Sequence, residues 1–137
     1  MIGILIVAHG SLGEALIQCA SHVVGARPPL LKQIGVSMHD NTDSLVSLAR
    51  EQITQLDQGE GVLVLSDIYG ATPCNLLCQL LIPGKIEGIS GVNLPMLVRA
   101  LQYRGEPLNT VVEKALSGGC DGVVHVTSEV CNVAAHG

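Results

Sequence analysis

The sequence contains no tryptophan and no phenylalanine, and Tyr69 and Tyr103 are its only aromatic residues apart from five histidines. Proteins that hold unpaired bases usually stack them on aromatic rings inside a basic groove. Basic residues are also scarce, because 7 lysines and arginines face 12 acidic residues and leave a net charge of −5. Nucleic-acid binding is therefore not expected, and a flavin ring would find only Tyr69 placed to stack on it.

Long hydrophobic stretches are missing as well. The longest apolar runs, such as Ile4 to Ala8, fall far short of the roughly 20 residues that span a bilayer. The first residues carry no positively charged stretch of the kind that opens a signal peptide. With 137 residues, of which 47% are hydrophobic, the chain is predicted to form one soluble, cytoplasmic domain that does not insert into a membrane.

The five cysteines are odd in number and show no repeating spacing. Without an export signal they are interpreted as free, mostly buried thiols in a reducing compartment. Cys74 and Cys78 would lie one turn apart on a helix, where they can bind a metal ion or sense oxidation. No second pair of metal ligands accompanies them, so neither a metal nor a cofactor is expected.

The remaining pattern alternates between short apolar runs rich in β-branched residues and longer segments with helical periodicity. This alternation predicts an α/β three-layer sandwich with a mostly parallel, flavodoxin-like sheet in the strand order 2-1-3-4. Residues 1-127 are expected to form this single domain, and residues 128-137 a C-terminal tail. Strands are predicted at Ile2 to Ala8, Leu30 to Val36, Gly61 to Ser66, Lys85 to Ser90 and Gly122 to Thr127. Helices are predicted at Glu14 to Val24, Asp43 to Leu56, Thr72 to about Leu81, Leu94 to Tyr103 and Pro107 to Ser117.

Local signals mark the ends and inner faces of these helices. Asn41 or Thr42 is the expected cap of the second helix. Thr72 is expected to cap the third, with Pro73 at its first helical position. The pair Gly118-Gly119 is expected to end the fifth. For the first helix, the predicted inward residues are Ala15, Leu16, Cys19, Ala20 and Val23.

The two central predicted strands lead into side chains that can take part in a reaction. In a sheet of this order the winding direction reverses between strands 1 and 3, and ligands bind at their carboxyl ends. Strand 1 runs into His9, and strand 3 runs into Asp67. A carboxylate that accepts the proton of one imidazole nitrogen fixes the tautomer and leaves the other lone pair free to act as a base, a metal ligand or a nucleophile. His39, in the loop after the second strand, can reach the edge of the same crevice.

The neighbours of this pair favour a phosphate site. Gly10, Ser11 and Gly13 lead from the histidine into the first helix. The Thr72-Pro73 helix start lies just beyond Asp67, and backbone N–H groups at helix N-termini hold phosphate well. No further histidine or cysteine-rich loop completes a metal shell, and no GxxxxGK[ST] loop is present for a nucleoside triphosphate. A phosphoryl relay through histidine is indicated, and the competing interpretation is a surface histidine beside a turn aspartate.

The chain also resembles a known family, the IIA domain of the mannose-type sugar phosphotransferase system. The resemblance covers Met1 to about Thr127 and rests on three stretches in matching order and spacing: MIGILIVAHGSLGEAL, VLVLSDIYGATPCN and GVNLPML. It implies that the phosphocarrier protein HPr phosphorylates His9 on Nε2 and that Asp67 holds Nδ1. The group would then pass to a IIB protein, which phosphorylates sugar through a membrane permease. Gly70, Thr72 and Asn75 match the rest of the motif D-x-x-G-[AG]-[ST]-P-x-N. Together with Gly10 and Ser11, which follow His9, they are the predicted phosphate-binding residues.

The resemblance further implies an assembly. Members of the family are homodimers whose last strand runs antiparallel at the sheet edge, at the subunit interface, and Gly122 to Thr127 would be that strand here. No IIB domain follows it, so a IIB partner is expected to be a separate protein. Sugar transport and a regulatory role for a stand-alone IIA protein both stay open. The alternative from another class is a flavodoxin-like binding module for a phosphorylated small molecule.

Overall fold

The computed structural model describes residues 1–136, so Gly137 of the predicted tail lies outside the described residues. Nearly all predicted elements are present. The strands are β1 (Gly3–His9), β2 (Leu31–Val36), β3 (Val62–Ser66) and β4 (Ile86–Ser90). The helices are α1 (Leu12–Val24), α2 (Thr42–Leu56), α3 (Thr72–Cys78), α4 (Leu94–Tyr103), α5 (Leu108–Asp121) and α6 (Ser128–His136). Across these described residues, no helix combines the length and the apolar character needed to cross a bilayer.

The sheet has the predicted strand order. Its strands run β2-β1-β3-β4, and every neighbouring pair is parallel. In the register, His9 lies opposite Val36 of β2, and Val7 lies opposite Ser66 of β3. His9 and Asp67, the residue after Ser66, therefore reach the same carboxyl edge of the sheet.

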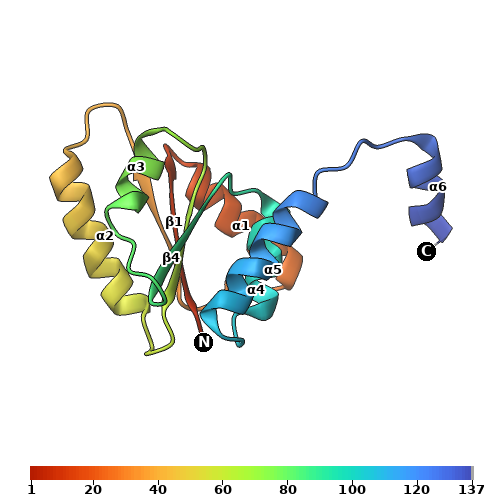
Figure 1. The fold of residues 1–137 in the computed structure, drawn as a ribbon. Helices are drawn as coiled ribbons and strands as arrows, with labels where there is room; N and C mark the ends of the chain where they lie inside the picture. The colour runs from red at the N-terminus through yellow and green to blue at the C-terminus, as the bar shows by residue number, and fades with distance from the viewer. Residues whose placement is uncertain (137) are drawn as a thin grey trace.

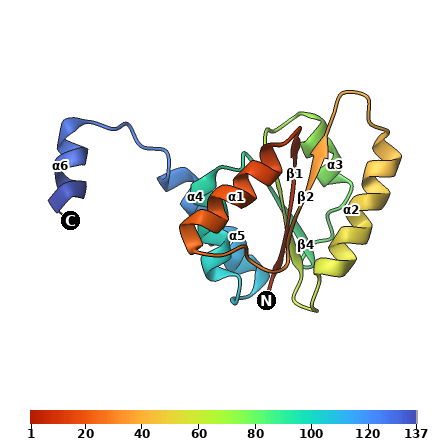
Figure 2. The same ribbon diagram turned by 180° about the vertical axis from the view of Figure 1, so that it is seen from behind.

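Helices cover both faces of the sheet and complete three layers (Figure 1). α2 and α3 pack on one face, and α1, α4 and α5 pack on the other, as the reverse view also shows (Figure 2). Alternate residues of β1 pack into the two hydrophobic cores, one on each face of the sheet. Ile4 and Ile6 belong to the core under α1, α4 and α5, whereas Leu5 and Val7 belong to the core under α2 and α3. All four side chains are fully buried, so β1 is packed from both sides and holds His9 at its end in a fixed position.

The inner face of α1 differs from the prediction. Ile17 and Ala20 are fully buried, and Leu16 packs partly buried against the core. Three of the predicted inward residues are instead exposed, namely Ala15, Cys19 and Val23. Because α1 carries apolar residues on most of its sides, hydrophobic periodicity alone does not decide which face turns inward.

The predicted end of α5 is wrong. The pair Gly118-Gly119 does not stop the helix, which continues to Asp121. Both glycines are buried where α5 packs on α4. A Cβ atom on Gly118 would lie 2.6 Å from the Cβ atom of Arg99, and one on Gly119 would lie 2.8 Å from the end of the Met96 side chain. Glycine is needed here for close helix packing rather than for a helix cap.

The N-cap of α3 lies one residue earlier than predicted, and the helix ends sooner than predicted. Its N-cap is Ala71, so Thr72 takes the first helical position and Pro73 the second. The last helical residue is Cys78 rather than Leu81. The Thr72 side chain is therefore not the cap of this helix.

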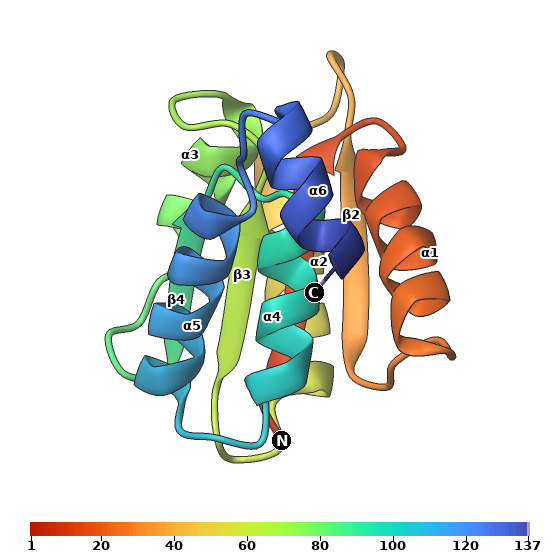
Figure 3. The same cartoon turned by 90° about the vertical axis from the view of Figure 1, so that its right-hand side faces the viewer.

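The predicted antiparallel edge strand is absent from the sheet of this single chain. The segment 122–127 forms no ladder with β4, and its side chains Val123, Val124 and Val126 are 77%, 54% and 67% exposed. Beyond it, α6 stands away from the sheet and its helices (Figures 1 and 2). Figure 3 looks along this projection, with α6 nearest the viewer. A strand needs a neighbouring edge, and this segment projects away from the edges of its own sheet.

The cysteines also differ from expectation. All five are free, but Cys74 is the one that is buried. The exposed thiols belong to Cys19, Cys78, Cys120 and Cys131. The interpretation that most of them are buried is therefore wrong.

Candidate functional site

His9 and Asp67 meet at the carboxyl ends of the two central strands. The His9 ring nitrogen Nδ1 lies 2.8 Å from Oδ2 of Asp67, and the same oxygen accepts the backbone N–H of His9 at 2.9 Å. The other oxygen, Oδ1, accepts the backbone N–H of Ile68 at 2.9 Å. Both carboxylate oxygens are thus held, and the carboxylate cannot turn away from the imidazole without losing these bonds.

The ionisation of Asp67 decides which ring nitrogen of His9 carries the proton. Burial is the largest single influence on Asp67 and favours the neutral acid. The backbone N–H of His9, its ring and the N–H of Ile68 together outweigh burial and lower the pKa of Asp67 below its ordinary value of 3.8. An ionised carboxylate only accepts hydrogen bonds, so the shared hydrogen belongs to Nδ1. In the neutral imidazole, Nε2 of His9 then keeps its lone pair.

The two side chains differ in exposure. Asp67 is 10% exposed, whereas His9 is 54% exposed. His9 also lines an open cavity of about 520 Å³, together with Thr72 and the end of β2 with the loop that follows it. A ring that is anchored at Nδ1 and half exposed presents its other nitrogen to a molecule arriving from solvent.

Gly10 and Ser11 follow His9 directly and lead into α1. Gly10 has a φ of 54°, in the left-handed region that favours glycine. Its N–H donates to the carbonyl of Val36 at 2.9 Å, so this group is already used inside the protein. Ser11 is the N-cap of α1 but its side chain makes no capping bond. The Ser11 hydroxyl and the first N–H groups of α1 are therefore available to a ligand.

The remaining predicted phosphate-binding residues lie in the loop after Asp67 and on α3. Thr72 lines the same cavity as His9. Gly70 has a φ of 82° and lies exposed in the loop. Asn75 is exposed on α3, where its backbone N–H donates to Ala71 at 3.0 Å. Of the predicted phosphate-binding residues, Thr72 thus lines the cavity with His9, while Gly10, Ser11, Gly70 and Asn75 do not.

The loop after β2 forms one wall of the cavity, and from this loop the sequence predicts only His39 at the crevice edge. β2 pairs in parallel with β1, so its carboxyl end leads to the same edge, and this adjacency is the signal that the sequence offers. Within the loop, the Asp40 carboxylate accepts the N–H of Ser37 at 2.7 Å, and this bond lowers the pKa of Asp40. His39, which was expected at the crevice edge, does not line the cavity. The lining residues from this segment and the start of α2 are Val36, Ser37, Met38, Asp40 and Thr42.

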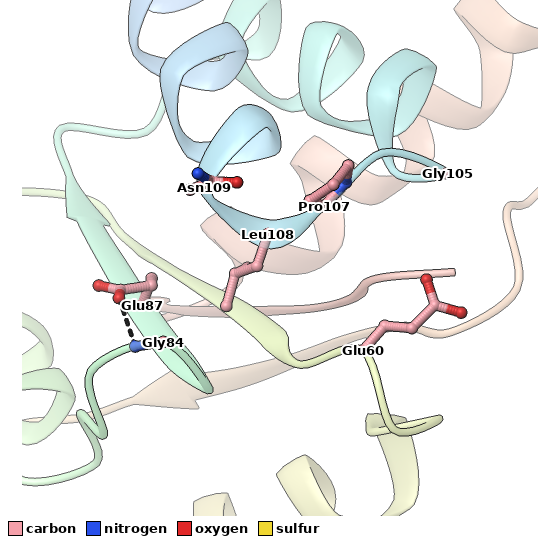
Figure 4. Close-up of a pocket in the computed structure, with 7 residues that line it drawn as sticks. All are labelled: Glu60, Gly84, Glu87, Gly105, Pro107, Leu108 and Asn109. Carbon is pink, nitrogen blue, oxygen red and sulfur yellow. Dashed lines mark hydrogen bonds between the residues drawn. The ribbon is translucent and has the colours of Figure 1, made fainter.

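A second cavity, of about 600 Å³, lies at the opposite edge of the sheet, beside the start of α5 (Figure 4). Glu87 accepts the N–H of Gly84 there at 2.8 Å, and Glu60 pairs with the amino terminus at 2.8 Å. None of the predicted site residues lines it. Among residues 1–136, no three His, Cys, Asp or Glu side chains gather closely enough to hold a metal ion.

Known proteins resemble this chain in sequence and in fold. The family model described as "PTS system fructose IIA component" matches residues 3–116. The chain belongs to this family, EIIA-man. The matched residues include His9, Asp67 and the whole of α3. Family membership makes the chain a IIA component of the mannose group, which is consistent with phosphoryl transfer in a sugar phosphotransferase system.

Individual relatives of this EIIA-man chain support the assignment. The PTS system mannose-specific EIIAB component of Escherichia coli (strain K12) is 31% identical over 125 residues, a match that covers 89% of this chain and 38% of that relative. The chain therefore spans well under half the length of this curated relative. The transcriptional regulatory protein LevR of Bacillus subtilis (strain 168) is 24% identical over 102 residues, or 74% of this chain and 11% of that protein. The crystal structure of phosphotransferase system component EIIA from Streptococcus agalactiae matches with a TM-score of 0.81 and 26% identity, over 91% of this chain and 97% of that chain.

Proposed function

We propose that this EIIA-man chain is a phosphocarrier, in which His9 accepts a phosphoryl group from phosphorylated HPr and gives it up to a IIB protein. The observation that carries the proposal is the 2.8 Å contact between His9 Nδ1 and the ionised carboxylate of Asp67. This contact orients the ring and leaves Nε2, on a half-exposed side chain, as the nucleophile.

The proposed transfer takes place at one nitrogen. The lone pair of His9 Nε2 forms the new N–P bond while the bond between phosphorus and its donor atom on HPr breaks, and the donor leaves with that electron pair. The imidazole then carries a positive charge, which the Asp67 carboxylate stabilises through the Nδ1–H hydrogen bond. When the acceptor attacks phosphorus, the electrons of the N–P bond return to Nε2 and the ring becomes neutral again.

The proposed phosphate-binding residues contribute in different ways. The Ser11 hydroxyl and the first N–H groups of α1, which follow His9 directly, donate to the phosphoryl oxygens. The Thr72 hydroxyl, which lines the same cavity as His9, donates as well. Gly70 and Asn75 are assigned to phosphate binding by the family motif that they match, because they do not line the cavity of His9. Gly10 contributes its left-handed turn rather than its N–H, because that group bonds to Val36.

The phosphorylated chain would serve either sugar transport or a regulatory signal, and the downstream acceptor distinguishes the two. A IIB protein and a permease encoded beside this chain would favour transport, whereas HPr and its kinase alone would favour regulation. The direct assay adds a purified IIB protein to the phosphorylated chain. Loss of the phosphoryl group from the chain, with its gain by IIB, is expected for transport.

The proposed assembly is a homodimer in which the segment 122–127 of each copy pairs antiparallel with the sheet edge of the other. Support comes from the exposure of Val123, Val124 and Val126, which a neighbouring strand would cover. In this arrangement residues 1-127 form the IIA domain, and residues 128-137 remain its tail.

Phosphoryl acceptance is tested by incubating the chain with phosphoenolpyruvate, the first enzyme of the system and HPr, and measuring its intact mass. The mass should rise by one phosphoryl group only when all three are present. The group should be lost in brief acid and kept in base, because phosphohistidine is acid-labile. A modification that survives acid, or that forms without HPr, contradicts the proposal. A chain that accepts no phosphoryl group but is purified with a phosphorylated small molecule would favour the binding-module alternative.

A further inference from the structure

Two cysteines of α3 lie directly behind the loop that carries Asp67. Cys74 and Cys78 are four residues apart on this helix, so they occupy one face, with their Cβ atoms about 5–6 Å apart. Cys74 is buried and 5% exposed, whereas Cys78 is exposed. Both thiols are free. Solvent therefore reaches the thiol of Cys78, whereas the thiol of Cys74 is shielded from solvent.

The surroundings of Cys74 connect it to the site. The backbone N–H of Gly70 is the strongest influence on its thiol and lowers the pKa of Cys74. Burial acts in the opposite direction, but Ser90, Ser66 and Cys78 add to the lowering. The two serine hydroxyls hydrogen-bond each other at 3.0 Å, at the ends of β4 and β3. Cys74 thus packs between the strand ends and the loop that holds Asp67.

We propose that Cys74 and Cys78 form an oxidative modification site, in which a hydroperoxide oxidises Cys78 and Cys74 closes a disulfide that displaces the loop at residues 67–72. The proposed loop displacement rests on the position of Cys74 beside Cys78 and beside the loop, and not on the function of His9. The expected effect on phosphorylation rests, in addition, on the proposed function of His9.

The chemistry balances with the hydroperoxide as oxidant. The Cys78 thiolate attacks one peroxide oxygen, so that an S–O bond forms, the O–O bond breaks and the leaving oxygen takes a proton. The Cys74 thiolate then attacks the Cys78 sulfur, which forms the S–S bond and breaks the S–O bond as hydroxide leaves and is protonated. With hydrogen peroxide, two thiols become one disulfide and the peroxide becomes two water molecules.

The disulfide requires a change in backbone geometry. Its Cβ atoms must approach to about 3.5–4.5 Å, closer than a regular helical turn allows. Cys78 is the last residue of α3, so the helix end can tighten toward Cys74. Reorientation of the buried Cys74 sulfur also disturbs its packing beside Gly70 of the loop. A shift of about 1 Å near reacting groups is enough to slow a transfer reaction roughly 10- to 100-fold.

The test treats the full chain with hydrogen peroxide and reads three properties. Intact mass should fall by two hydrogens, and peptide mapping should join Cys74 to Cys78. Amide hydrogen exchange of residues 67–72 should rise in the oxidised protein. Phosphorylation by HPr should slow roughly 10- to 100-fold and recover on reduction with a thiol. Cys78→Ser should keep its phosphorylation rate after peroxide, whereas the matched control Cys120→Ser, an exposed thiol on α5, should respond as wild type does.

Each outcome decides a separate point. A disulfide that joins other cysteines, or no disulfide at all, overturns the modification site. A Cys74–Cys78 disulfide without a change in hydrogen exchange at residues 67–72 overturns the proposed loop displacement. If the reduced protein accepts no phosphoryl group, the proposed function of His9 fails, while mass and hydrogen exchange still test the disulfide and its effect on the loop.

Discussion

The contacts between His9 and Asp67 favour the ionised carboxylate and fix the tautomer of the neutral imidazole. The carboxylate takes hydrogen bonds from the ring, from the backbone of His9 and from Ile68, and these bonds keep it ionised. The ionised carboxylate in turn holds the proton on Nδ1 and frees Nε2. In the proposed transfer, these two side chains leave Nε2 of His9 as the nucleophilic atom.

Asp67→Asn should preserve the fold and slow phosphorylation of His9 by about 10²- to 10⁴-fold. An amide still bonds to the ring, but it does not stabilise the positive charge on the phosphorylated imidazole and it permits the other tautomer. The measurement is the rate of phosphoryl gain from HPr, with Asp43→Asn in the exposed first turn of α2 as the matched control. Transfer at the wild-type rate in Asp67→Asn would show that Asp67 is merely a turn residue.

The lowered pKa of Asp67 predicts a pH dependence of stability. A carboxyl group whose pKa is lower in the folded state stabilises that state above its ordinary value of 3.8, and the contribution disappears as the pH falls through the folded value. The free energy of unfolding of wild type minus that of Asp67→Asn should therefore be largest above pH 3.8 and shrink below it. Urea unfolding at a series of pH values measures this difference. A difference that stays constant on acidification is incompatible with the ionised pair.

Some helix ends in this chain depend on local residues and others on packing against a distant segment. The sequence predicts the local ends better. The cap of α2 is local: Asn41 Oδ1 accepts the N–H of Ser44 at 3.1 Å, and the predicted choice of Asn41 or Thr42 resolves to Asn41. The end of α5 depends on a distant segment, because Gly118 fits against Arg99 of α4. A glycine pair has the same appearance in a sequence whether it caps a helix or admits a neighbouring helix.

Gly118→Ala should destabilise the protein. In a free helix this change stabilises by about 1 kcal/mol. Here the new Cβ atom would lie 2.6 Å from the Arg99 Cβ atom and 3.3 Å from the Pro95 carbonyl oxygen, neither of which is the flexible end of a side chain. Overpacking of this kind costs about 1–3 kcal/mol, so the free energy of unfolding in urea should fall. Ser117→Ala, at an exposed position of the same helix, should change it by less than about 0.5 kcal/mol. A more stable Gly118→Ala would contradict the close packing of α4 and α5.

The sheet and the meeting of His9 with Asp67 were predictable from the sequence, because both depend on strand order. Alternating strands and helices indicate parallel pairing, and the order 2-1-3-4 places the ends of strands 1 and 3 together. The lining by Ser37, Met38 and Asp40 was not predicted, and His39 was predicted in their place, since no motif marks the residues of a loop whose role comes from lying beside β1. The C-terminal segment was not predictable either, because an exposed valine-rich stretch takes its structure from whatever it packs against.

The wild-type chain should be a homodimer at micromolar concentration, because pairing covers the exposed valines of the segment 122–127. Light scattering measures the mass. The double variant Val124→Asp with Val126→Asp should be monomeric with an unchanged circular dichroism spectrum, since two charges in each segment 122–127 oppose its burial. A wild-type chain that is monomeric and fully folded would exclude the proposed assembly.

The central claim is that His9 accepts the phosphoryl group, and one comparison of intact masses tests it most directly. Wild type, His9→Ala and His39→Ala are each incubated with phosphoenolpyruvate, the first enzyme of the system and HPr. His39 lies in the loop beside the site but does not line its cavity, so it controls for loss of a nearby imidazole. We predict one acid-labile phosphoryl group on wild type and on His39→Ala, and none on His9→Ala. Phosphorylation of His9→Ala to the same extent as wild type would contradict the account.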